Sequence, residues 1–333
     1  MTKDFSIGEV LGLMAKTTPF LVFRFVVYFG ITVAFVMVTG VGAGIGYGIG
    51  AVGGAAGAGG MWGGIAGFGL ASAVLFFLRE YLLYLVKAGH IAVLVELSEG
   101  RAIPDGQGQI EYARRMVQAR FAQSSVLFAV DQLIKVILRA FNRTFLSIAG
   151  LLPLPGAQGV VKLLNTIVNL SLTYLDEVIL AHLMKTRADN PWRSSQTALV
   201  LYAQNYKAFL KNAVWLALLI WGATIVVFLV VLAPAALLVG LLPGAAGPLT
   251  LLLAVVFAWG VKQAVIEPVA MTALMLVFFR VTAGQVADPE WEARLDGVSG
   301  RFRELKTRAA DWSREHGDVP APVVPPPLPP AGT

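Results

Sequence analysis

The chain has 333 residues, of which 57% are hydrophobic and only 14% are charged. A soluble domain is about 45–50% apolar and about 25% charged, so this composition excludes a soluble globular enzyme and a disordered chain. Cysteine is absent, which excludes a disulfide-rich secreted module. The net charge of +6 does not indicate a nucleic-acid partner, because the cations are sparse in so apolar a chain. The composition predicts an all-α integral membrane protein.

The N-terminal segment, residues 1–19, precedes the first long apolar stretch. Within it, residues 5–14 place apolar side chains at helical spacing. Such a segment usually lies along the membrane surface. We therefore predict a cytoplasmic amphipathic segment over 1–19, with a partner-binding helix as the alternative.

Long stretches without charge predict the membrane spans. No charged residue occurs over 25–78 or over 212–261, and each stretch exceeds twice the roughly 20 residues that cross a bilayer. A third and shorter stretch, 144–161, lies between apolar segments with scattered charges. Gly or Pro near the middle of each stretch suits a tight connection. The pattern predicts a transmembrane domain over 20–284 with about six helices in three hairpins, 20–97, 124–185 and 212–281. The paired helices of these hairpins are 20–46 with 60–97, 124–150 with 158–185, and 212–241 with 247–281.

Glycine is concentrated in the first predicted hairpin, where residues 40–69 hold fifteen glycines. No Lys-Ser/Thr pair follows, so this is not a phosphate-binding loop. Small residues let helices approach closely in lipid. The pattern therefore predicts tight packing within the hairpin or glycine-mediated homo-oligomerisation, with a flexible gate as the third alternative.

Lysine and arginine occur in the terminal segments and in the loops between the hairpins, but not at the hairpin tips. By the positive-inside rule, both termini and both long loops face the cytoplasm. We expect a multi-pass protein of the cytoplasmic (inner) membrane. Its predicted partner is the lipid bilayer, anionic lipids in particular, with a small-molecule solute and a second copy of the chain as further partners.

An amphipathic stretch follows each predicted hairpin after a Pro-containing turn: 109–121, 194–209 and 291–312. This order fits either a threefold internal repeat or the ordinary loops of a polytopic protein. The last stretch predicts a cytoplasmic amphipathic helix within 285–316. Residues 317–333 are rich in proline and predict a disordered tail.

Polar residues of the middle hairpin fall on one face of each helix. They recur every three or four residues along the two helices: Asp131, Lys135, Arg139 and Arg143, then Lys162, Asn165, Asn169, Thr173 and Asp176. Folding the pair about Leu154 sets Lys135 opposite Thr173 and Asp131 opposite Glu177. Ionisable groups at membrane depth usually mark function. A water-accessible pathway or binding site is one interpretation, and a structural ion-pair network or an interfacial helix over 124–150 are the others.

Polar residues also occur near the ends of the outer hairpins. Tyr84, Lys87 and His90 are expected to be interface residues of a helix that extends into the cytoplasm. Glu267 lies about 20 residues into the last helix, after Lys262 and before Pro268. Because proline can kink a helix, we predict either an acid at a transport-site kink or an interfacial acid paired with Lys262.

Catalytic patterns are absent from the sequence. The three histidines form no H-E-x-x-H motif, and no Gly-x-Ser-x-Gly elbow occurs. Asp176 and Glu177 are adjacent, so on a helix their side chains point about 100° apart. We expect no enzyme activity, no catalytic or metal site and no cofactor.

The C-terminal third, from about Tyr174 to Gly284, resembles choline transporter-like proteins. The resemblance rests on Thr173-Tyr174 near the end of a span, the polar segment 194–198, two asparagines before a long apolar pair of helices, and the small, polar and aromatic residues of 257–279. It implies a transporter of an organic cation such as choline. Aromatic faces and a nearby acid recognise such a cation, and the resemblance implies these roles for Tyr174, Trp259 and Glu267.

Our leading hypothesis is a membrane transporter or channel for a small solute. The residues predicted to line its pathway or bind the solute are Asp131, Lys135, Arg139, Asn169, Tyr174, Asp176, Glu177, Trp259, Lys262 and Glu267. The alternative is a non-transporting membrane scaffold or assembly protein that binds lipids or partners through its amphipathic loops and proline-rich tail.

Overall fold

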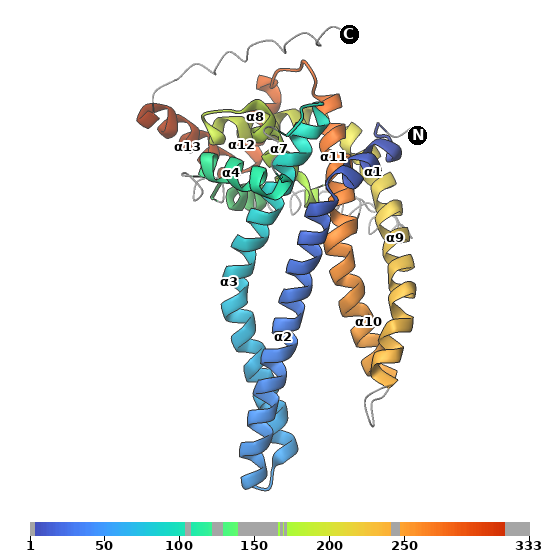
Figure 1. The fold of residues 1–333 in the computed structure, drawn as a ribbon. Helices are drawn as coiled ribbons and strands as arrows, with labels where there is room; N and C mark the ends of the chain where they lie inside the picture. Colours follow the sequence, from blue (N-terminus) through green and yellow to red (C-terminus); the bar gives the residue numbers. More distant parts are fainter. Residues whose placement is uncertain are drawn as a thin grey trace, which may run out of the picture.

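The computed structural model describes residues 4–103, 108–121, 129–138, 166, 169, 172–240 and 247–316. Every regular element in these ranges is a helix. Shorter helices gather at one end of the molecule, and two pairs of long helices extend from them in one direction (Figure 1). We call this gathering of short helices the head. It contains α1 (Ile7–Lys16), α4 (Gln109–Phe121), the segment 129–138, α7 (Leu175–Thr186), α8 (Pro191–Gln204), α12 (Pro289–Val298) and α13 (Gly300–His316).

The first hairpin pairs α2 (Thr18–Val52) with α3 (Ala56–Ser98) through a short turn in which Gly54 has φ +72°. Glycines at four-residue spacing let the two backbones touch. A Cβ at Gly46 would collide with the carbonyl oxygen of Gly59, and one at Gly63 with that of Gly42. The predicted tight packing within this hairpin is therefore confirmed. A second glycine row on α2, at 40, 44 and 48, meets no atom within 4 Å.

The second hairpin pairs α9 (Tyr206–Gly240) with α10 (Gly247–Val261). A π-helical turn, η2 (Lys262–Ile266), joins α10 to α11 (Glu267–Val281). The helix predicted over 247–281 therefore forms, with its irregularity immediately before Pro268. The irregularity is a change of hydrogen-bond register, because Phe257–Val281 still qualifies as one continuous span.

Long apolar helices associate the protein with a membrane. By length and composition, two helices among the described residues can cross a bilayer: Tyr206–Leu237 and Phe257–Val281. A third is added if α1 and Thr18–Ile31, bent by 75°, count as one broken span. Large apolar side chains are exposed along both hairpins beyond the head, among them Met37, Ile45, Trp62, Phe68, Leu229, Val230 and Leu237. The prediction of an all-α membrane protein is confirmed to this extent, with two or three candidate spans where six were predicted.

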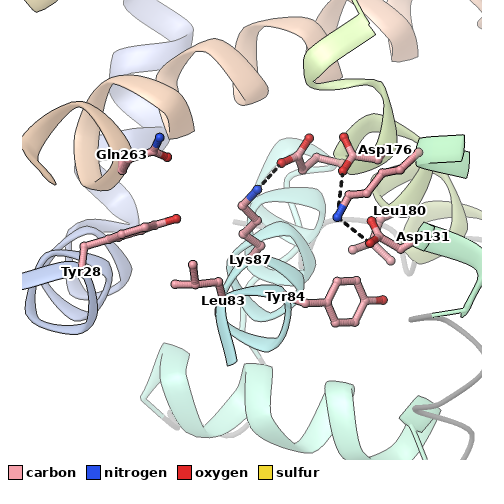
Figure 2. Close-up of a pocket in the computed structure, with 10 residues that line it drawn as sticks. Tyr28, Leu83, Tyr84, Lys87, Asp131, Asp176, Leu180 and Gln263 are labelled. Atoms are coloured by element: carbon pink, nitrogen blue, oxygen red, sulfur yellow. Dashed lines mark hydrogen bonds and ion pairs between the residues drawn. The ribbon is translucent and has the colours of Figure 1, made fainter. Parts of the chain in front are cut away.

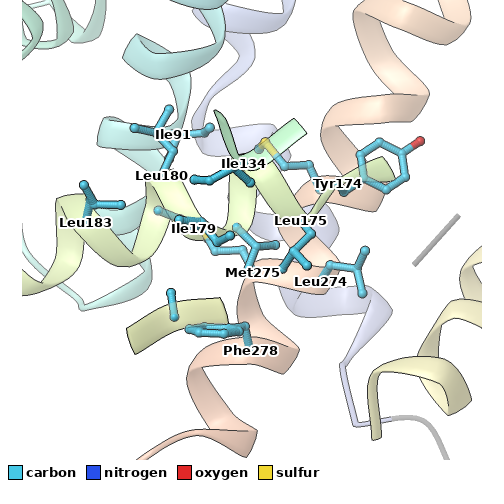
Figure 3. Close-up of a cluster of buried hydrophobic side chains, with 14 of the residues drawn as sticks. Ile91, Ile134, Tyr174, Leu175, Ile179, Leu180, Leu183, Leu274, Met275 and Phe278 are labelled. Atoms are coloured by element: carbon cyan, nitrogen blue, oxygen red, sulfur yellow. The ribbon is translucent and has the colours of Figure 1, made fainter. Parts of the chain in front are cut away.

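The middle predicted hairpin, 124–185, is described only in part. Segment 129–138 and α7 pack in the head with α3 and α11 through a shared apolar core (Figure 3). Ile91 of α3, Ile134, Ile179 of α7 and Met275 of α11 are at most 2% exposed. Most of 139–171, including Arg139 and Leu154, lies outside the described residues.

The remaining amphipathic segments complete the head. The stretch predicted over 109–121 is α4, and the N-terminal one is α1. Asn212 of α9 holds the start of α1, since its side chain accepts from the Asp4 N–H and donates to the Asp4 carboxylate, each at 2.8 Å. The helix predicted within 285–316 is two helices, α12 and α13, that meet at the extended Ser299. Residues 317–333 lie outside the described residues.

Candidate functional site

A pocket lies where the head meets both hairpins (Figure 2). Its volume is about 110 Å³, enough for several water molecules. Five separate segments, α2, α3, 129–138, α7 and η2, contribute to its wall. The lining residues are Tyr28, Leu83, Tyr84, Lys87, Asp131, Lys135, Asp176, Glu177, Leu180 and Gln263.

Two lysines and three carboxylates form ion pairs in the pocket wall. Lys87 Nζ lies 2.7 Å from Glu177 Oε1. Lys135 Nζ lies 2.7 Å from Asp131 Oδ2 and 3.6 Å from Asp176 Oδ2. The carboxylate residues are 7–8% exposed, whereas the lysine side chains are about 30% exposed (28% and 32%). The wall therefore contains three carboxyl groups and two lysines, and the lysines have access to solvent.

Local sequence places each charged group on the pocket side of its helix. Asp131 and Lys135 are four residues apart and so share a helix face. Asp176 and Glu177 stand in the first turn of α7, where the partial positive charge of the helix N-terminus stabilises carboxylates. Lys87 lies three residues after Tyr84 on α3. The packing of α3 against α7 brings Lys87 to Glu177.

The adjacent carboxyls of α7, which lies in the head, differ in their affinity for a proton. Burial, together with the neighbouring charge of Glu177, raises the pKa of Asp176 well above its ordinary value. Burial also acts to raise the pKa of Glu177, but the Lys87 ammonium, a hydrogen bond with Asp176 and the Lys135 ammonium together outweigh it and hold that pKa below its usual range. Glu177 is therefore the permanent anion of the pair, and Asp176 is the group that takes up a proton.

The π-helical turn forms the side of the pocket opposite α7. Gln263 lines the pocket beside Tyr28 (Figure 2), and Tyr28 makes an edge-to-face contact with Trp259, with ring centroids 6.4 Å apart. Lys262 Nζ pairs with Glu267 Oε1 at 2.7 Å across the turn. Of the two predictions for Glu267, the pairing with Lys262 is confirmed, and it occurs at a break of helical register.

The structure brings four of the ten predicted site residues into the pocket wall: Asp131, Lys135, Asp176 and Glu177. The predicted pairing of Lys135 with Thr173 is wrong, because Lys135 pairs with Asp176, another residue of the same polar stripe. The others lie apart from the wall. Tyr174 is 3% exposed in the apolar core, and Asn169 is exposed. Trp259 contacts Tyr28 of the wall, and Lys262 and Glu267 pair with each other. Arg139 lies outside the described residues.

Sequence reasoning missed the contributions of the first hairpin. Lys87 was expected at the membrane interface, yet its ammonium is the partner of a buried carboxylate. Tyr28 lies in a charge-free stretch and gave no signal, and Gln263 lies next to a predicted residue. The spacing of Tyr84 and Lys87 on one face of an apolar helix was the available signal.

Within the described ranges, no group of three or more His, Asp or Glu side chains is arranged to hold a metal ion. Comparison with models of known protein families, with curated proteins and with solved structures finds no match. The fold and the pocket therefore define the protein by class: an all-helical, membrane-associated protein with an ion-paired pocket at the junction of its head and its hairpins.

Proposed function

We propose that this protein is a membrane transporter for a small organic cation and that the pocket is its solute-binding site. The observation that carries the proposal is the composition of the pocket wall, in which three buried carboxylates face two lysines and stand beside two tyrosines. A buried carboxylate such as that of Glu177 attracts a cation, and aromatic rings bind quaternary ammonium groups through their faces. The resemblance of the C-terminal third to choline transporter-like proteins supports the same class of solute.

The proposal includes a topology. Both hairpins cross the cytoplasmic membrane, with their tips on the far side and with the head and both termini in the cytoplasm. The exposed apolar side chains of both hairpins, the charge-free stretches 25–78 and 212–261, and the cations of the head support this orientation. The pocket then lies at the cytoplasmic boundary of the bilayer.

Uptake into proteoliposomes tests the proposal, with labelled choline as the probe. We expect the purified protein to take up choline above the level of empty liposomes, and Glu177→Gln to lower that uptake at least about tenfold, because one charge contact to a bound cation contributes about 1.4 kcal/mol or more. Tyr28→Phe is a second pocket variant in the same assay. It removes only one hydroxyl from the pocket wall, so it is expected to fold normally.

Glu290→Gln is the matched control, because Glu290 belongs to an exposed pair on α12 and its loss leaves the pocket unchanged. Uptake by Glu290→Gln should equal that of the wild type. Wild-type uptake no higher than that of empty liposomes, or equal uptake by Glu177→Gln and Glu290→Gln, would refute the assignment.

A membrane scaffold is the second candidate, and a separate observation favours it. The charge-free stretches supply no Asp, Glu, Lys, Arg or His to the hairpins beyond the head, and many large apolar side chains there are exposed. A scaffold needs only an anchored head and no polar route. It predicts that anionic phospholipid vesicles raise the melting temperature of the protein while choline does not, whereas a transporter is stabilised by choline.

A further inference from the structure

The π-helical turn η2 contains a backbone carbonyl whose helical partner is missing. In η2 the Glu267 N–H donates to the carbonyl of Lys262, five residues earlier. The same register would pair the N–H of residue 268 with the carbonyl of Gln263. Residue 268 is proline, which has no N–H. A carbonyl away from water needs another donor, because an unsatisfied buried polar group costs about 1–3 kcal/mol.

Arg24 of the first hairpin supplies that donor. Its Nη2 lies 3.2 Å from the carbonyl oxygen of Gln263. The arginine is only 2% exposed, and burying a guanidinium is costly unless it is paired and hydrogen-bonded. The carboxylates of Glu177 and Glu267 attract it electrostatically. Arg24 therefore satisfies a backbone acceptor of the second hairpin and is attracted by the carboxylates of Glu177 and Glu267.

The same contact fixes two residues of the pocket wall. Tyr28 follows Arg24 by one helical turn on α2, and Gln263 carries the carbonyl to which Arg24 donates. We infer that Arg24 is a positioning residue that joins the two hairpins at the π-helical turn and so holds Tyr28 and Gln263 at the pocket. Arg24 is not itself among the residues that line the pocket. Two experiments test this inference, a melting-temperature cycle and a choline uptake assay, and only the uptake assay rests on the proposed function.

A double-mutant cycle tests the contact directly. Pro268→Ala restores an N–H that can donate to the Gln263 carbonyl, so the carbonyl no longer depends on Arg24. We expect Arg24→Gln to lower the melting temperature in detergent by several degrees, and to lower it by about half as much or less in the Pro268→Ala background, because contacting sites are not additive.

The chain offers a matched control in Pro234, which lies inside α9 and outside the contacts of Arg24. Arg24→Gln combined with Pro234→Ala should give additive shifts. Additive shifts in the Pro268→Ala cycle as well would overturn the inference. If Arg24→Gln fails to yield folded protein, Arg24→Lys, which keeps one donor and the charge, replaces it in the same cycle.

The second readout separates positioning from stability alone. In the choline uptake assay we expect Arg24→Gln to raise KM, and Arg24→Lys to restore KM most of the way to the wild-type value. An unchanged KM in Arg24→Gln would reduce the role of Arg24 to stability and overturn its positioning role. If the wild type takes up no choline, the proposed function fails, while the melting-temperature cycle still decides whether Arg24 joins the hairpins.

Discussion

At the scale of single residues, Glu177 and Lys87 form an ion pair whose carboxylate is largely buried. Glu177 is 7% exposed, and the Lys87 ammonium that it accepts from lies 2.7 Å away. Replacing the carboxylate alone leaves an ammonium in a largely buried pocket, whereas replacing both groups removes charge and desolvation cost together. The pair therefore contributes to the stability of the junction between α3 and α7, independently of any solute.

We predict that Glu177→Gln lowers the free energy of unfolding by about 1–3 kcal/mol, since a charged group loses its partner while it stays largely buried. The double variant Lys87→Met/Glu177→Gln should recover part of this loss. Chemical denaturation in a mild detergent measures both. In the exposed pair Arg294–Glu290, Glu290→Gln should change stability by about 0.5 kcal/mol or less. Equal losses in the two single variants would contradict a buried pair.

Among the elements, the first hairpin depends on glycines at particular positions and not on its glycine content. Gly46 on α2 faces the carbonyl of Gly59 on α3, whereas Gly44, half a turn away, meets no atom within 4 Å. Both glycines lie in the same helix and the same kind of sequence. Comparing an alanine substitution at each of these two positions therefore distinguishes the effect of the helix contact on stability from the effect of helix propensity.

We predict that Gly46→Ala destabilises the protein by about 1–3 kcal/mol, because a backbone contact must open to admit the methyl group. Gly44→Ala should be neutral or stabilising by up to about 1 kcal/mol, since alanine favours a helix more than glycine does. Thermal unfolding of both variants in one detergent makes the comparison. A loss of stability in Gly44→Ala as large as that in Gly46→Ala would mean that the row at 40, 44 and 48 also contacts a partner.

The sequence was sufficient to predict elements whose periodicity has one explanation. The stretch 109–121 was predicted with the bounds of α4, and the charge-free stretches identified both long hairpins. A stripe of charges at four-residue spacing, such as Asp131 and Lys135, has several explanations, because a pathway, an ion-pair network and an interfacial helix all place charges on one face. Lys87 and Arg24 were not predicted, since their partners are 90 and 239 residues away, and only the packing of helices brings them together.

For the whole molecule, the number of hairpins determines how many hairpin tips lie on the far side of the membrane. Two hairpins extend from the head among the described residues (Figure 1), whereas the sequence predicted a third over 124–185. The chain has no cysteine, so a single introduced cysteine reports one position without background. Labelling with a membrane-impermeant maleimide, before and after lysis, then reports the side on which that position lies.

We predict that Val52→Cys, at the 92% exposed end of α2, is labelled in intact spheroplasts, and that Gly297→Cys on α12 is labelled only after lysis. This result follows if the hairpin tips and the head lie on opposite sides of the membrane. Labelling of both cysteines under the same condition would contradict the proposed topology. Labelling of Leu154→Cys then decides between two and three hairpins. A third hairpin places position 154 on the same side of the membrane as Val52, whereas two hairpins leave it on the side of Gly297.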